Sequence, residues 1–228
     1  MDVDRLRSLF PDRRILYFDA IDSTQRAAAG EGLGAVVLAD RQLAGQGRHG
    51  HTWHSEAANG IYCSIVLEST PLLTLALGIA AVEAIAQATG IVCDLRWPND
   101  LMLDGLKTGG ILVQLVDGMA ISGIGINVNH AALPDELNAT SLRIHAKRPI
   151  AREDIVAALL PAVDSVVKED PETILRLFAH ASSYVSGRRV VVNEIQGVTA
   201  GLDPAGFLKV RQDDGTVTLI LAGGVRAA

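Results

Sequence analysis

Apolar residues in the first 186 positions gather into short β-prone runs and a few helix-length segments. Runs such as Gly60–Glu68 (GIYCSIVLE) predict strands. Thr74–Ala88 is apolar nearly all round, which predicts a buried helix. Strands are predicted at 14–19, 35–40, 60–68, 92–97, 110–116 and 119–128, and helices at 22–29, 74–88, 150–167 and 171–180. Helices and strands that occur in mixed runs predict the α+β class.

The pattern changes near Gly187. From there on, the short β runs RRVVV, GVTAGL, GFLKVR and TVTLIL alternate with turn residues. Closely spaced short strands of this kind predict a small β-barrel. We therefore expect a larger α+β domain at 1–186 and a small β domain at 187–228.

Composition and charge narrow the class of protein. The chain has 228 residues, 49% of them hydrophobic, which excludes a disordered chain. The formal net charge of −6 argues against a protein that coats nucleic acid. Two cysteines, Cys63 and Cys93, are typical of reduced core thiols, and the charged first ten residues do not resemble a signal peptide. The apolar stretch 72–90 contains Glu83 and Gln87 and is too short to cross a bilayer, so we expect a cytoplasmic protein.

A long polar loop at 41–59 is the first candidate for chemistry. Loops of this length inside a compact domain are usually functional or mobile. Gly45–Gly50 (GQGRHG) formally matches a dinucleotide-binding pattern, but no helix follows the glycines, as that fold requires. Backbone N–H groups together with Arg48 instead suit a phosphate.

Histidines in the same loop raise the question of a zinc site. His49, His51 and His54 lie close together, and Cys63 is a candidate fourth ligand. Their spacing fits no standard zinc pattern. We therefore expect solvated loop histidines.

Three later segments also carry reactive groups. In Arg96–Asp100 (RWPND), the amide and the carboxylate at the end suit a ligand, a magnesium ion or an amine. Lys107 opens an apolar strand, where an ammonium group can reach a phosphate. Gly123–Asn129 (GIGINVN) has alternating glycines, which allow close approach of a flat ligand or of backbone. The chain has neither a P-loop nor a hydrolase nucleophile elbow.

Taken together, these segments resemble the biotin protein ligase family. Its members show D-S-T-N, Q-T-A-G-R-G-R, K-W-P-N-D, a lysine before G-I-L, and G-x-G-I-N, in that order. This chain has DSTQ at 22–25, QLAGQGR at 42–48, RWPND at 96–100, Lys107 before GIL at 110–112, and GIGIN at 123–127. It departs from the pattern at Gln25, Gln46 and Arg96, and the Gln46 change removes one cation from the loop.

The resemblance implies a fold and a reaction. The fold is a mixed sheet with packed helices, like the catalytic domain of class II aminoacyl-tRNA synthetases, followed by a small SH3-like β-barrel. The reaction joins biotin and ATP to biotinyl-5′-AMP, then transfers biotin to a lysine of a biotin carboxyl carrier domain, that of acetyl-CoA carboxylase or a related carboxylase. Magnesium accompanies the nucleotide. Because the first strand begins near Arg14, we expect the short form without a DNA-binding domain, with no DNA or membrane partner. Pairing of two subunits through a free sheet edge is left open.

The resemblance also implies residue roles. Arg48 and Lys107 contact the carboxylate and the α-phosphate, and Asp100 completes the catalytic group. The residues expected to bind biotin and ATP are Ser23, Thr24, Gln25, Gln42, Gly45, Gln46, Gly47, Arg48, Trp53, Asn99, Lys107, Gly123, Gly125 and Asn127, with Asp100 and Asn127 as magnesium contacts. Two alternatives remain, a lipoate or octanoate protein ligase and a biotin-binding sensor without turnover.

Overall fold

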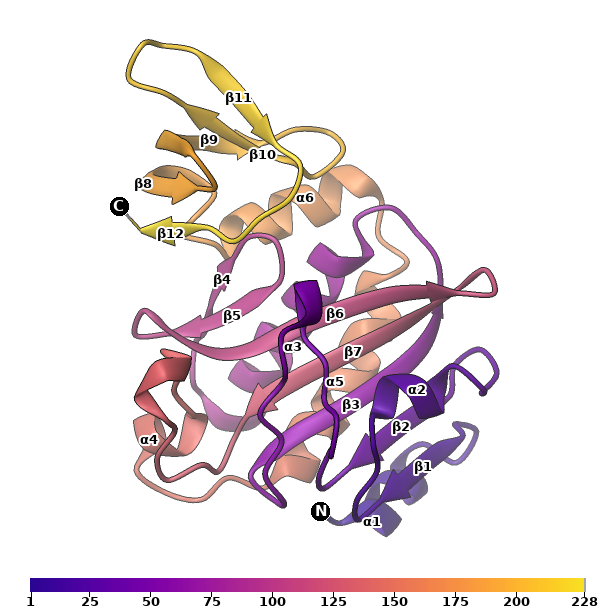
Figure 1. Ribbon diagram of the computed structural model, residues 1–228. Helices are drawn as coiled ribbons and strands as arrows, with labels where there is room; N and C mark the ends of the chain where they lie inside the picture. The colour runs from indigo at the N-terminus through magenta and orange to yellow at the C-terminus, as the bar shows by residue number, and fades with distance from the viewer. Residues whose placement is uncertain (228) are drawn as a thin grey trace.

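A computed structural model describes residues 1–227, except for the side chains of His49 and Ala227 (Figure 1). Its centre is a seven-stranded sheet in the order β1-β2-β3-β7-β6-β5-β4. The β1–β2 pair is parallel and the other pairs are antiparallel. The strands are β1 Ile15–Phe18, β2 Val36–Ala39, β3 Gly60–Glu68, β4 Asp94–Arg96, β5 Asp100–Leu103, β6 Leu106–Val116 and β7 Met119–Asn127.

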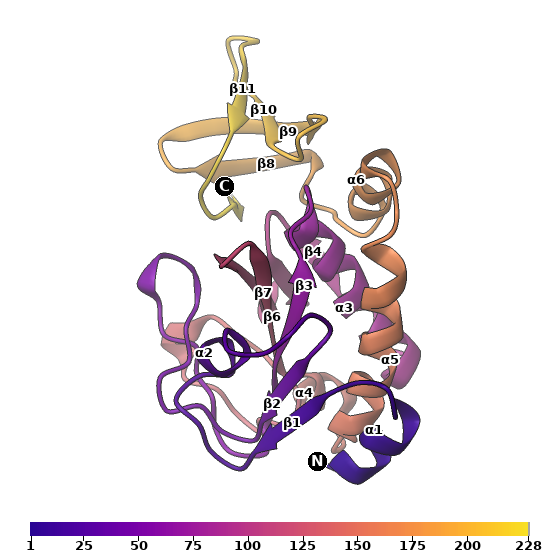
Figure 2. The same ribbon diagram turned by 90° about the vertical axis from the view of Figure 1, so that its right-hand side faces the viewer.

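Helices cover the two faces of this sheet unequally. Figure 2 shows α1, α3, α5 and α6 on one side, and α2 with the loop that follows β2 on the other. The helices are α1 Val3–Leu9, α2 Thr24–Ala28, α3 Leu73–Thr89, α4 Leu142–Ala146, α5 Arg152–Val166 and α6 Pro171–His180. Most side chains of α3 are buried, because it lies between the sheet and α5. The main hydrophobic core therefore lies on the α3 side and leaves the other face for the loop.

A second sheet follows α6. It is antiparallel, five-stranded and ordered β11-β10-β9-β8-β12. Its strands are β8 Ser186–Val192, β9 Ile195–Leu202, β10 Leu208–Arg211, β11 Val217–Ile220 and β12 Arg226–Ala227. The Trp97 indole N–H donates to the carbonyl of Gly206 at 2.9 Å, which joins the two sheets. The predicted α+β class with a small C-terminal β part is confirmed, while the domain boundary at 186/187 stays a prediction.

Several predicted elements match the structure closely. The strand at 60–68 has the predicted ends, and α3 extends the predicted helix by one residue at each end. The predictions missed α1, α4, β5 and β12, and β6 begins at Leu106 and not at 110. The missed elements have only two to seven residues, too few to show a hydrophobic period. Within residues 1–227 no helix has both the length and the apolar character that crossing a membrane requires.

Candidate active site

A cavity of about 480 Å³ opens where the loop after β2 faces β5, β6 and β7. Every residue expected to contact biotin, ATP or magnesium lines it, with one exception. The exception is Gly45, which lines an adjoining hollow formed in part by the same loop. The structure thus brings five separate sequence segments to one place.

A chain of polar side chains forms one wall of the cavity. Gln42 Oε1 accepts from the Thr24 backbone N–H at 2.9 Å and from its hydroxyl at 3.1 Å. Gln42 Nε2 donates to Ser55 Oγ at 3.1 Å, and the buried Ser64 hydroxyl donates to Thr24 Oγ1 at 2.9 Å. These contacts fix the Gln42 amide and the Thr24 hydroxyl at the start of α2. They give the wall donors and acceptors in a set orientation.

Some polar atoms on this wall have no protein partner. Within the described residues, Ser23 Oγ and Gln25 Oε1 are buried and make no hydrogen bond. Gln25 Nε2 does donate, to the carbonyl of Leu112 at 3.0 Å. Buried polar atoms normally find partners. Unpaired groups that line a cavity are therefore suited to a polar ligand such as a cyclic urea.

Two glycines of β7, Gly123 and Gly125, leave room for side chains that pack directly on the strand. A Cβ on Gly125 would lie 2.6 Å from the Trp53 ring, so the indole rests directly on the β7 backbone. A Cβ on Gly123 would lie 3.1 Å from Gln25 Cδ. The alternating glycines of β7 therefore accommodate side chains from the loop and from α2, and these side chains form the floor of the cavity.

Charged groups also line the cavity. Asp100 lies between two cations, with Oδ1 2.5 Å from Lys107 Nζ and Oδ2 2.7 Å from Arg96 Nη2. Arg48 donates from Nη1 to Asn99 Oδ1 at 2.8 Å. Arg48, Lys107 and Arg226 line the cavity against Asp100 and Glu136, so the lining has a formal net charge of +1. That charge suits anionic ligands such as a carboxylate and a phosphate.

The two expected magnesium contacts differ in their surroundings. Both oxygens of Asp100 are already held by Lys107 and Arg96. Asn127 is buried, and its Nδ2 donates to the Thr140 carbonyl at 3.1 Å. Asp100 therefore fits a role that positions cations better than a role as a metal ligand.

Sequence reasoning missed part of the cavity wall. Gly223, Gly224 and Arg226, at the end of the second sheet, line it, as do residues of the 133–139 segment. These positions lie far along the chain from the recognised motifs. Nothing in their local sequence indicates a site, since only the packing of the second sheet brings them there.

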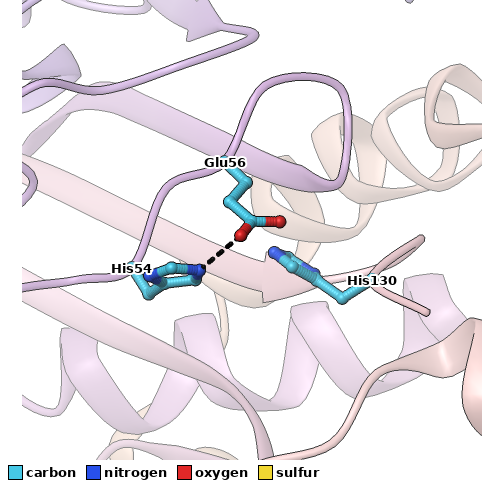
Figure 3. A group of neighbouring side chains, drawn as sticks. All are labelled: His54, Glu56 and His130. Atoms are coloured by element: carbon cyan, nitrogen blue, oxygen red, sulfur yellow. Dashed lines mark ion pairs between the residues drawn. The ribbon is translucent and has the colours of Figure 1, made fainter. Parts of the chain in front are cut away.

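Among the described side chains, the loop histidines and Cys63 do not form a group that could hold a metal ion. The side chain of His49 lies outside the described part of the structure, and Cys63 is buried within β3. Burial raises the pKa of the Cys63 thiol to about 12. His54 instead lies beside Glu56 and His130 (Figure 3).

Known proteins are similar to this chain over the segments that line the cavity. Residues 17–130 match the model of the Biotin/lipoate A/B protein ligase family. A bifunctional ligase/repressor BirA from Bacillus subtilis is 39% identical over 65% of this chain and 52% of its own length. A biotin–[acetyl-CoA-carboxylase] ligase from Mycobacterium tuberculosis is 30% identical over 89% of this chain and 79% of its own. The chain therefore spans about half the length of its Bacillus relatives.

Solved structures agree along the whole fold. The biotin protein ligase from Aquifex aeolicus in complex with biotin and ATP superimposes with a TM-score of 0.86 and 28% identity. That match covers 94% of this chain and 99% of the Aquifex chain. It includes both sheets.

Proposed function

The chain belongs to the biotin/lipoate A/B protein ligase family, and we propose that it is a biotin protein ligase. The observation that carries the proposal is the cavity itself. It is lined by the hydrogen-bonded Thr24 and Gln42 and also by Arg48 and Lys107, groups that suit the polar ring and the carboxylate of one ligand. The similarity to relatives named as biotin ligases supports the choice of acid.

In the first half-reaction, a carboxylate oxygen of biotin forms a bond to the α-phosphorus of ATP. The bond to the pyrophosphate oxygen breaks, and biotinyl-5′-AMP and pyrophosphate result. Two anions must meet, so fixed cations are needed where charge accumulates. Lys107 is already held by Asp100, and Arg48 by Asn99. Both cations are therefore positioned before substrates bind.

In the second half-reaction, the ε-amine of an acceptor lysine attacks the carbonyl carbon of the mixed anhydride. The carbon–nitrogen bond forms, AMP leaves, and the amine loses a proton. No protein nucleophile is needed, in keeping with the absence of one in the motifs. The loop at 41–59 lies over the cavity and limits the access of water to the adenylate.

Magnesium enters this scheme with the nucleotide. Each carboxylate oxygen of Asp100 already accepts from a cation, Lys107 or Arg96, and the positive charge of these neighbours disfavours a magnesium ion there. The residues present do not fit a resident magnesium ion at Asp100. We therefore treat magnesium as part of the MgATP substrate, with Asn127 as the remaining candidate contact.

The acceptor that we propose is the carrier domain of acetyl-CoA carboxylase or a related carboxylase. The name of the Mycobacterium relative supports the first of these. We also propose a cytoplasmic location, since both cysteines are free and buried, as in proteins of a reducing compartment. Pairing of two subunits stays a prediction.

A second candidate is a lipoate or octanoate ligase, because the matching family includes lipoate ligases. The polar wall around Thr24 and Gln42 favours biotin, since neither lipoate nor octanoate carries a ureido ring. A sensor without turnover is the third reading. The positioned Lys107 and Arg48 argue against it.

ATP–pyrophosphate exchange tests the proposal before any acceptor is known. The purified chain is given MgATP, labelled pyrophosphate and one acid at a time: biotin, lipoate or octanoate. We expect exchange with biotin alone. Exchange with lipoate or octanoate would overturn the choice of acid. Biotin binding without exchange would support the sensor.

A further inference from the structure

Three side chains that the proposed reaction does not use meet beside the cavity. His54 and Glu56 lie near the end of the loop at 41–59, and His130 follows β7 (Figure 3). One nitrogen or oxygen atom from each lies within 4.8 Å of the others. Two distant parts of the chain thus bring two imidazoles and a carboxylate to one point.

His130 has the features of an unsatisfied ligand. Its side chain is buried, with 1% of the residue exposed, and neither ring nitrogen has a hydrogen-bond partner among residues 1–227. Figure 3 shows the ring pointing toward the Glu56 carboxylate. Burial lowers the pKa of His130, so the ring is neutral near pH 7, which is the form that binds metal ions. Buried polar groups are normally hydrogen-bonded, so a buried imidazole without a partner is unusual. The ring faces the Glu56 carboxylate, which is a second group able to bind a metal ion.

His54 and Glu56 supply the other two groups. His54 Nε2 lies 3.1 Å from Glu56 Oε1, yet Nε2 is buried and makes no aligned hydrogen bond. Asn59 Nδ2 donates to Glu56 Oε2 at 3.0 Å, which leaves Oε1 on the histidine side. The Asn59 hydrogen bond, followed by the proximity of His54, lowers the pKa of Glu56 and keeps the carboxylate ionised. The Glu56 carboxylate is therefore in the form that a cation requires.

We propose that His54, Glu56 and His130 form a binding site for a divalent transition metal, best matched by Zn²⁺. Two imidazole nitrogens and one carboxylate oxygen suit zinc, whereas magnesium and calcium prefer oxygen ligands alone. Tetrahedral zinc with bonds of about 2.0–2.1 Å separates its ligand atoms by roughly 3.3 Å. The His54–Glu56 spacing already fits, and the ligand atom of His130 lies within 4.8 Å of both. The fourth position is open to water.

A metal ion at this site would link the end of the cavity loop to the segment that follows β7. His54 directly follows Trp53, whose ring packs on Gly125 of β7. His130 comes three residues after the end of β7. A bound ion therefore fastens the end of the cavity loop to the segment that follows β7.

Zinc binding to the untagged, chelator-stripped protein tests this site. ZnCl₂ alone is titrated by calorimetry, and zinc per chain is measured after gel filtration. We expect one zinc per chain in the wild type, with affinity about 100-fold weaker or worse in His54→Ala and in Glu56→Gln. His145→Ala is the matched control, because His145 pairs with Asp104 at 2.9 Å but has no third ligand in the described structure. It should bind zinc as the wild type does.

Thermal unfolding gives a second readout. Zinc should raise the unfolding midpoint of the wild type and of His145→Ala, but not that of His54→Ala. Because His130 is buried, its Asn variant counts only if it folds, and the two loop variants decide the question without it. Zinc binding unchanged in both loop variants, or absent from the wild type, would overturn the site. Neither readout depends on biotin activation, so the two proposals fail separately.

Discussion

Lys107 and Asp100 form an ion pair whose Nζ–Oδ1 distance is 2.5 Å, between two neighbouring strands of the sheet. The second oxygen of the same carboxylate accepts from Arg96 Nε and Nη2, at 3.1 Å and 2.7 Å. One half-buried carboxylate therefore holds two cations, of which Lys107 lines the cavity. The ion pair holds the partly exposed Lys107 ammonium group in one position beside the cavity.

Lys107→Ala should abolish biotin-dependent ATP–pyrophosphate exchange, with a loss of at least about 10²–10³-fold. The reason is that the substitution removes the cation from the place where carboxylate and phosphate meet. Exchange assays and thermal unfolding, run side by side, check it. Lys168→Ala, at an exposed position away from the cavity, is the control and should keep full exchange. Wild-type exchange in Lys107→Ala would remove Lys107 from the mechanism.

Arg48→Gly should release the adenylate. Arg48 begins a short 3₁₀ turn in the loop and donates to Asn99 at 2.8 Å, so it ties the loop to the β5 side of the cavity. Without this tie, biotinyl-5′-AMP should form but escape and hydrolyse. Gel filtration of enzyme with labelled ATP measures retained adenylate. Arg148→Gly, in an exposed bend, is the control, and normal retention in Arg48→Gly would contradict the role of Arg48 in closure.

The sequence predicted the elements that a local pattern specifies and missed those that depend on contacts between distant residues. Thr74–Ala88 is apolar on all sides and lies buried within α3. An apolar segment of this length predicts a buried helix from its own sequence, without knowledge of its neighbours. The α1 helix has seven residues and buries only Val3 and Leu6, so its stability comes from tertiary packing. β5 begins at Asp100, where a polar pair resembles a turn, and only its pairing with β6 makes it a strand.

For the site, the motifs could be recognised but their surroundings could not. The family pattern identified the residues that line the cavity, since each segment carries its own signature. Arg226 reaches the cavity only through the packing of the second sheet. His130 meets Glu56 only because the loop ends beside β7. Contacts of this kind depend on the whole fold, so they produce no spacing pattern that could be recognised in the sequence.

Gly125→Ala should weaken biotin binding and destabilise the protein. The added Cβ would lie 2.6 Å from the Trp53 ring, so either the indole or the strand must shift. Overpacking of this kind costs about 1–3 kcal/mol. Biotin titration and the urea midpoint measure both effects. Gly32→Ala is the matched control, since nothing lies within 4 Å of its added Cβ, and equal behaviour of the two variants would contradict the close packing of Trp53.

Alkaline pH should destabilise the protein through its two thiols. Burial raises the pKa of Cys63 and of Cys93 to about 12, while the unfolded chain has thiols near 9. Between these values the folded state holds more protons than the unfolded state, so stability falls as pH rises from about 9 toward 12. At pH 10 the loss is of order 1.4 kcal/mol per thiol. Urea unfolding at pH 7 and pH 10 should show a smaller loss in the Cys63→Ala/Cys93→Ala double variant, and an equal loss would contradict the assignment.

Asp100→Asn separates the two roles open to this carboxylate. Both of its oxygens hold cations, so we expect it to position Lys107 and Arg96 and not to bind magnesium. The amide keeps the shape but loses the charge, which leaves the two cations unpaired and displaces Lys107. Exchange at saturating MgATP should then fall by about tenfold or more. The free-magnesium concentration that gives half-maximal exchange should stay where it is in the wild type. If Asp100 were instead a metal ligand, that concentration would rise and excess magnesium would restore the rate. A magnesium titration of both proteins at fixed ATP and biotin therefore decides between a residue that organises the phosphate-binding cations and one that holds the metal.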